Sequence, residues 1–246
     1  MRIARPAVAL SLAGCLVQIG IAARVGFGQE NVTRLDFERP DKDGTPAGWK
    51  RVLKEGTGTA EVVTRVERSE LHTQTGRGLL RFERELELEL DPADGLRVAW
   101  EWKVDEMPET PEFKAWDRDK RQGPYRTNSP IQVLVAFRNG RSVYVIHYVW
   151  EPTVEAGATW YEQETKYGVV TMNYVRQVVQ SGTERMREWH PHEQDVIADF
   201  KKLFPGKKVP KIINIAIQST SSYAEGKGAK SRAAIAKLRL MQGMAD

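Results

Sequence analysis

Apolar and polar residues alternate strictly along several segments of this chain of 246 residues. Between residues 96 and 104 every second side chain is large and apolar, whereas Glu101 and Lys103 fall on the other face. A period of two is typical of a β-strand with one buried face. The same pattern predicts strands over residues 131–138, 142–150, 169–180, 211–219 and 234–241, and weaker strands over 32–38, 60–66 and 79–90.

The segment 142–150 can be interpreted in two ways. Asn139-Gly140 precedes it and predicts a hairpin with strand 131–138. If its valines are buried, Tyr148 and Trp150 line an exposed face that can bind a ligand. If its aromatic residues are buried, His147 joins the polar face instead. Periodicity alone does not decide between these two arrangements.

One helix is predicted, over Gln194–Leu203, because its apolar residues form a single stripe at helical spacing. Pro205-Gly206 ends it. His190-Pro191-His192 is interpreted as the turn at which the helix begins. Two histidines at this spacing, with no third ligand nearby, do not predict a metal site.

These elements predict an all-β fold, namely a single jelly-roll-like antiparallel β-sandwich with one short late helix. Each strand has one apolar face, which a second sheet about 10 Å away would bury. The composition, 41% apolar and 28% charged, is too apolar for a disordered chain. No glycine-rich nucleotide motif and no Cys-x-x-Cys occurs, so we expect neither a cofactor nor a bound metal.

The first 28 residues predict an export signal peptide. A basic start is followed by the uncharged, mostly apolar segment 7–23, and the small residues Gly26 and Gly28 precede the expected cleavage site. Residues 29–246 would then form the single domain, in the periplasm or outside the cell. In an alternative interpretation, Leu12-Ala13-Gly14-Cys15 is a lipoprotein signal, and a lipid on Cys15 anchors the protein. We expect contact with a membrane only through this segment or that lipid.

The net charge of +4 comes largely from the predicted signal segment, whose three arginines lie ahead of the first acidic residue. Without them, 34 bases face 33 acids, which gives a net charge of +1. A nearly neutral domain has no basic surface for nucleic acid, so we expect no nucleic-acid partner.

Seven short segments follow one another in a characteristic order between about residues 32 and 241. They are Leu35-Asp36-Phe37-Glu38, Pro46-Ala47-Gly48-Trp49, Trp100–Val104, Tyr148-Val149-Trp150, Val178–Gly182, Asp199-Phe200 and Ile213–Ile217. In this order and spacing the chain resembles a family of exported bacterial proteins catalogued as domain of unknown function 3047. The resemblance implies an exported β-sandwich and identifies no catalytic residue.

Two departures from the family pattern concern metal binding. Members of the family carry acidic residues where this chain has Asn128-Ser129-Pro130 and Gln218–Ser222. Because Ca²⁺ requires several carboxylate oxygens, the resemblance implies no Ca²⁺ site at either position of this chain.

Polar residues at strand centres and nearby aromatic residues are candidate ligand contacts. Aromatic rings pack on the C–H faces of sugars, while amides and carboxylates bond their hydroxyl groups. The predicted ligand-binding residues are Glu101, Lys103, Gln132, His147, Tyr148, Trp150, Trp160, Asn173 and Gln218. We expect Glu101 and Asn173 to share one face, covered by the long loop 151–168 that carries Trp160.

The sequence therefore predicts an exported, non-catalytic domain that binds a glycan or another hydroxyl-rich ligand of the cell envelope. One alternative is a glycan-active hydrolase, which needs two carboxylates about 5–10 Å apart. Another is a lyase that uses His147 or Tyr148 as the base and Lys103 to neutralise a uronate. A structural or protein-interaction role in the envelope is the third, and the polar strand faces would then simply be solvated.

Overall fold

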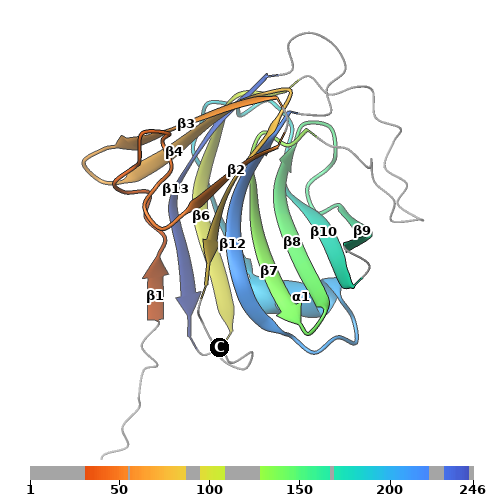
Figure 1. Ribbon diagram of the computed structural model, residues 1–246. Helices are drawn as coiled ribbons and strands as arrows, with labels where there is room; N and C mark the ends of the chain where they lie inside the picture. The colour runs from red at the N-terminus through yellow and green to blue at the C-terminus, as the bar shows by residue number, and fades with distance from the viewer. Residues whose placement is uncertain are drawn as a thin grey trace, which may run out of the picture.

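The computed structural model describes residues 31–54, 56–86, 95–108, 128–166, 169–221 and 230–243. Two β-sheets pack face to face, and one short helix lies at one end between them (Figure 1). The prediction of an all-β sandwich with one late helix is confirmed. The predicted signal segment and Cys15 lie outside the described residues, and no helix among those described is long and apolar enough to span a membrane.

Sheet A has six strands in the order β11-β6-β13-β4-β3, and β1 lies beside part of β13. Sheet B has seven strands in the order β2-β5-β12-β7-β8-β10-β9. The strands of sheet A are β1 (Asn31–Arg34), β3 (Thr57–Thr64), β4 (Ser69–Gly76), β6 (Leu96–Glu106), β11 (His190–Asp195) and β13 (Lys230–Gln242). The strands of sheet B are β2 (Lys50–Lys54), β5 (Leu79–Glu85), β7 (Gln132–Asn139), β8 (Ser142–Glu151), β9 (Thr159–Lys166), β10 (Val170–Ser181) and β12 (Lys211–Thr220).

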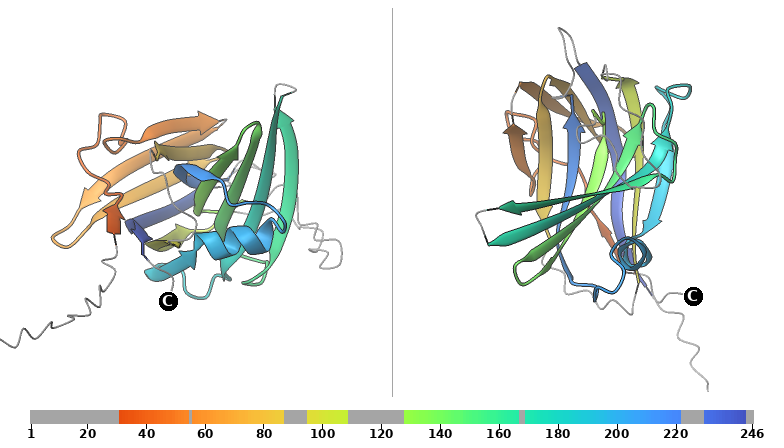
Figure 2. Two further views of the ribbon diagram at one scale, coloured as in Figure 1. Left: turned by 90° about the horizontal axis from the view of Figure 1, so that it is seen from below. Right: turned by 90° about the vertical axis from the view of Figure 1, so that its right-hand side faces the viewer.

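All strand pairs are antiparallel except β8 and β10, which run parallel. The chain reverses direction after β8 to form β9 and reverses again to form β10, which inserts between the two (Figure 2). Two reversals restore the direction of β8, so its contact with β10 is parallel. The sandwich is antiparallel as predicted, apart from this one parallel pair among the described strands.

The predicted hairpin is present between β7 and β8, where Asn139 pairs with Ser142. Gly140 has φ +57° and is the first of the two residues in the turn. Glycine adopts this left-handed conformation without steric cost, and such turns match the twist of antiparallel strands. The Asn-Gly signal therefore located the turn correctly.

The two faces of β6 are divided as the alternation predicts. Trp100 and Trp102 are buried between the sheets with their rings 5.3 Å apart, while Glu101 and Lys103 point outward. Both faces of β8 are buried, and its aromatic residues are the ones that face the other sheet: Tyr148 and Trp150 lie in the same core as the two tryptophans of β6. The choice that periodicity left open is thus resolved, and His147 lies on the outer face of sheet B.

The helix α1 (Val196–Leu203) begins two residues later than predicted, with Asp195 as its N-cap. It covers the inner face of sheet B beyond the edge of sheet A (Figure 1). There Phe200 packs against Phe137 at a ring distance of 4.7 Å. The turn predicted at His190-Pro191-His192 is wrong, because these residues form β11 and pair with β6.

Candidate functional site

The nine predicted ligand-binding residues occupy four separate places. Glu101 and Lys103 lie on the outer face of sheet A, and Asn173 lies at the far end of sheet B, on the side that faces α1. The prediction that Glu101 and Asn173 share a face is wrong, because β6 and β10 belong to different sheets. Tyr148 and Trp150 are in the core. The remaining four, Gln132, His147, Trp160 and Gln218, are on the outer face of sheet B.

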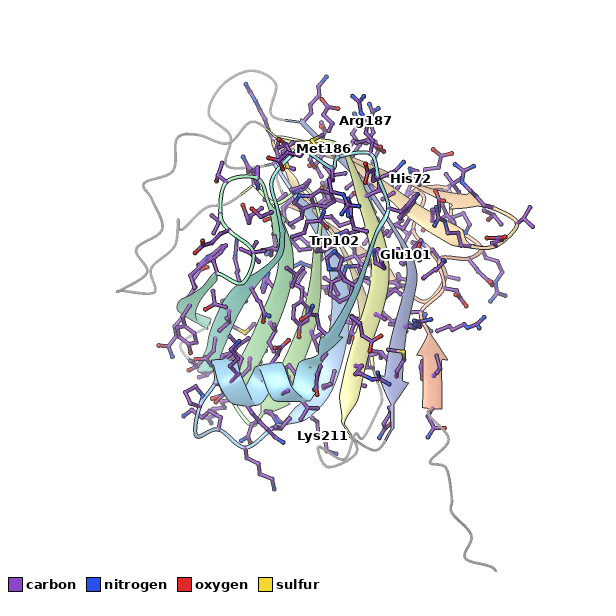
Figure 3. The ribbon with its side chains drawn as sticks, turned by 180° about the vertical axis from the view of Figure 1, so that it is seen from behind. His72, Glu101, Trp102, Met186, Arg187 and Lys211 are labelled. Atoms are coloured by element: carbon purple, nitrogen blue, oxygen red, sulfur yellow. The ribbon has the colours of Figure 1, made fainter. Side chains whose placement is uncertain are left out.

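On sheet A, Glu101 is held by two cations. Its carboxylate accepts from Arg68 at 2.9 Å and from Lys237 at 2.8 Å. Arg68 in turn stacks 4.0 Å from the ring of Trp189 and also pairs with Glu70. These groups satisfy one another on the outer face seen in Figure 3, which is typical of a solvated ion-pair network.

The two aromatic candidates on β8 have structural partners. The hydroxyl of Tyr148 donates to Asp199 Oδ2 at 2.9 Å, and the indole N–H of Trp150 donates to the Gly182 carbonyl at 2.9 Å. Burial raises the pKa of Tyr148 well above its ordinary value. Their predicted role as surface ligand contacts is therefore wrong, since both side chains are enclosed in the core.

Strand register brings a set of polar side chains together on the outer face of sheet B. Gln132 of β7 is paired with Gln218 of β12, which is paired with Arg81 of β5. His147 of β8 lies beside Gln132 and bonds to it. We call Arg81, Gln132, His147 and Gln218 the Gln–His cluster.

Hydrogen bonds fix the orientation of each side chain in the cluster. The Nδ1–H of His147 donates to Gln132 Oε1 at 3.0 Å, and Arg81 Nε donates to Gln218 Oε1 at 2.8 Å. Because the carbonyl oxygen of Gln132 can only accept, His147 carries its proton on Nδ1. The Nε2 atom of the imidazole therefore presents a lone pair.

Two polar atoms of the Gln–His cluster are buried without a hydrogen-bond partner: Nε2 of Gln132 and Nε2 of His147. The two side chains are 0% and 5% exposed. Burial, reinforced by the charges of Arg176 and Arg81, holds the pKa of His147 well below its ordinary value, so the ring is neutral. An unsatisfied buried group of this kind lowers the free energy of unfolding by about 1–3 kcal/mol, and the folded protein has two such groups here.

Aromatic and apolar residues adjoin the cluster on the same face. The Tyr174 ring lies edge-on to His147 at 5.8 Å, and the Arg176 guanidinium lies 6.0 Å from the centre of the Trp160 ring. Trp160 is in β9, paired with Arg176, and does not belong to a covering loop as predicted. Arg81, Tyr174 and Arg176 were missed by the sequence analysis, although each lies in a predicted strand next to a buried apolar residue, Phe82 or Val175.

Among the described residues, no group of three or more His, Cys, Asp or Glu side chains is placed to hold a metal ion. His190 bonds the Arg185 carbonyl at 2.9 Å, and His192 bonds Gln180 Oε1 at 2.9 Å, so both have structural partners. The expected absence of a metal and of a cofactor stays a prediction. Of the long segments between predicted strands, residues 109–127 and 222–229 lie outside the described part of the chain.

Comparison with solved structures finds proteins of similar architecture. A family 11 carbohydrate-binding module of a Clostridium thermocellum cellulase aligns with a TM-score of 0.43 and 11% identity, covering 88% of this chain and 97% of its own. The xyloglucanase domain of NopAA from Sinorhizobium fredii has a TM-score of 0.48 and 7% identity, with coverage of 86% and 98%. A xylan-binding domain of Paenibacillus barcinonensis Xyn10C has a TM-score of 0.40 and 11% identity, with coverage of 88% and 97%.

At the level of sequence, no curated protein matches the chain. A family match covers its central strands and the helix, from the Gly48-Trp49 segment to the middle of β13. The family is described as "Protein of unknown function (DUF3047)", and because the match extends over residues 48–236, more than three quarters of the sequence, the chain belongs to this family.

Proposed function

We propose that this protein is an exported binding domain for a glycan or another hydroxyl-rich ligand of the cell envelope, which it binds at the Gln–His cluster. The observation that carries the proposal is the pair of buried, unpartnered Nε2 atoms of Gln132 and His147. One is a donor and the other, in the tautomer fixed by Gln132, is an acceptor. Hydroxyl groups both donate and accept, so hydroxyls of one ligand satisfy both atoms.

The charges around the cluster favour an uncharged ligand. Arg81 is paired with Glu83 at 3.1 Å in addition to its bond to Gln218. His147 is neutral. The half-buried ring of Tyr174 on the same face supplies an apolar contact of the kind that the C–H faces of sugars require, whereas Trp160 is buried beside Val149 and Val178 and supports the face from within. Arg81, Tyr174 and Arg176 beside the two buried Nε2 atoms are only partly buried, so a ligand reaches those atoms when these side chains move aside.

Export is part of the proposal and rests on the signal segment within residues 1–28. The protein is then processed near Gln29 and works in the periplasm or outside the cell. Mass spectrometry of the exported form tests this step. An N-terminus at a diacylated Cys15 would replace cleavage near Gln29 with lipid anchoring.

A glycan array identifies the ligand, and a double variant tests the site. Gln132→Met with His147→Leu removes every polar atom of the pair, including those that bond each other. We expect the melting temperature to stay equal or rise, because two unsatisfied groups are lost, while the Kd for the array ligand rises about tenfold or more.

Gln74→Met is the matched control, since Gln74 is an exposed amide on the outer face of sheet A. It should leave both binding and stability unchanged. If the double variant binds the ligand like the wild type, the Gln–His cluster is not the site.

A second candidate function is that of a lyase acting on uronate-containing glycans, and the neutral His147 between two arginines favours it. Nε2 of His147 would take the proton at C5 while the C4–O bond breaks. A C4–C5 double bond forms, the proton taken by His147 is passed to the leaving oxygen, and Arg81, released from Glu83, neutralises the carboxylate. The three lyase residues predicted from the sequence, His147, Tyr148 and Lys103, do not form one site, because Tyr148 is in the core and Lys103 is on sheet A.

Incubation with polygalacturonate or alginate separates this candidate from simple binding. New ultraviolet absorbance from an unsaturated uronate, lost in His147→Ala, would establish the lyase. The hydrolase alternative finds less support. Of the acidic residues on this face, Glu83 is already paired with Arg81, and Glu151 is fully buried and accepts a hydrogen bond from Ser129.

A further inference from the structure

A groove opens on the opposite side of sheet B from the Gln–His cluster. There β8, β9 and β10 extend past sheet A, and the chain that leaves α1 passes across them (Figure 2). Phe204 and Lys207 of this segment line the groove. The space between the sheet and this crossing segment is about 360 Å³. This is the lower end of the range for small-molecule sites, about 300–1,000 Å³.

Three aromatic rings form the apolar part of the groove. Phe204 packs edge-on against Tyr144 at 5.0 Å and against Tyr161 at 6.1 Å. Tyr144 and Phe204 are buried, whereas Tyr161 is 46% exposed. The groove therefore presents one exposed ring supported from below by two buried rings.

Asn173 holds the polar part of the groove in place. Its Oδ1 accepts from the Tyr161 hydroxyl at 2.7 Å and from Gln163 Nε2 at 3.2 Å, and its Nδ2 donates to the Val143 carbonyl at 3.2 Å. Asn173 is buried, so a fixed amide orients two exposed side chains before any ligand arrives. Preorganisation of this kind lowers the entropic cost of binding.

The groove is almost uncharged. Burial, with a smaller effect of Tyr144, raises the pKa of Tyr161, so its phenol stays protonated at neutral pH. The hydroxyl gives its hydrogen to Asn173, and its oxygen can accept from a ligand. Among the lining residues only Lys207 carries a formal charge, and Ser142 and Thr171 add hydroxyl groups.

We propose that this groove is a second binding site, which takes an uncharged sugar of one or two rings stacked on Tyr161. The exposed ring packs on the C–H face of the sugar. Tyr161, Gln163 and Lys207 bond its hydroxyl groups. The proposal shares no residue with the Gln–His cluster and does not depend on it.

Two-dimensional ¹H–¹⁵N NMR of the mature protein tests the groove directly. The probes are the methyl glycosides of glucose, galactose, mannose and xylose at millimolar concentration. We expect at least one probe to shift amide resonances around residues 142–144, 161–173 and 203–207. The proposal is overturned if none of the four shifts these resonances, or if the shifts gather around Gln132 and His147.

Variants of Tyr161 then test whether its ring binds the probe. Tyr161→Ala should weaken binding of the shifting probe about tenfold, which corresponds to the worth of one aromatic contact plus one hydrogen bond. Tyr161→Phe keeps the ring and should lose less. Leu53→Ala is the control, because Leu53 is 45% exposed in β2, the opposite edge strand of the same sheet.

Thermal melts of each variant show whether it folds, and the Gln132→Met/His147→Leu protein should bind the probe normally. Equal affinity of Tyr161→Ala and wild type would overturn the groove site alone. Failure of the proposed function would appear instead as unchanged binding of the array ligand by the double variant.

Discussion

The imidazole of His192 links the stability of this protein to pH. The ring stacks 5.6 Å from Trp100 and lies 4.9 Å from Trp102, and its Nε2 bonds Gln180 Oε1. Burial, with a smaller contribution from His190, lowers the pKa of His192 from 6.5 to about 4. The folded state therefore resists protonation, whereas the unfolded chain takes up the proton near pH 6.5.

Because the unfolded state binds this proton more readily, the free energy of unfolding should fall as the pH drops from about 6.5 to about 4. The contribution of His192 to the free energy of unfolding is fully present above about pH 6.5, the pKa of this residue in the unfolded chain. His147 acts in the same direction. We expect the melting temperature to decrease over this window, and to decrease less in His192→Gln, whose side chain takes no proton. A variant with the same pH profile as the wild type would contradict this assignment.

The residues of the site show what alternation along a strand reveals and what it does not. It correctly placed Glu101 opposite Trp100 and Trp102 on β6. It could not tell that β6 and β10 belong to different sheets, since sheet membership depends on pairings between residues far apart in the sequence. On β8 even the buried face was ambiguous, because Val149 and Trp150, on opposite faces, are both fully buried.

At the scale of elements, the strands that the sequence did not predict are those without an apolar stripe. β4 buries one large apolar residue, Leu71, and beside it the hydroxyl residues Thr73 and Thr75. Thr75 Oγ1 lies 2.8 Å from Ser221 Oγ and 2.9 Å from Ser231 Oγ, so a polar sequence is satisfied inside the sandwich. The sequence of β11 contains Pro191, which is typical of the start of a helix. Proline is nevertheless tolerated here, because β11 is an edge strand.

The true start of α1 gives a prediction at this scale. Asp195 accepts from the Ala198 N–H at 2.8 Å and caps the helix. Asp195→Ala leaves this donor unpaired and should lower the free energy of unfolding by about 0.5–2 kcal/mol in urea titrations. Glu193→Ala, which breaks only an exposed pair with Arg97, should change it by less than about 1 kcal/mol. Equal losses would show that the cap is not the cause.

At the scale of the whole molecule, one apolar cluster runs through both sheets and the helix. It extends from Leu35 after β1 to Leu240 in β13 and includes Phe200 of α1. The two smaller clusters lie on the outer face of sheet B. A shared core of this kind predicts that the sheets do not unfold separately.

We expect one thermal transition, with the same midpoint by far-ultraviolet circular dichroism and by tryptophan fluorescence. The midpoint should not move on addition of EDTA, because the sequence predicts no metal. A decrease of more than about 5 °C with the chelator would reveal an ion bound to the native state. Two separate transitions would show that the sheets are independent units.

The position of β13 also constrains when the protein can fold. This strand pairs with β6 on one side and β4 on the other, and β1 pairs with its end. A growing chain that has not yet reached residue 230 lacks the central strand of sheet A, and β4 and β6 have no shared neighbour. Such distant pairings form late and slowly. In the export that we propose, passage through a translocation channel requires an unfolded chain, and the order of synthesis itself delays closure of sheet A until β13 has been made.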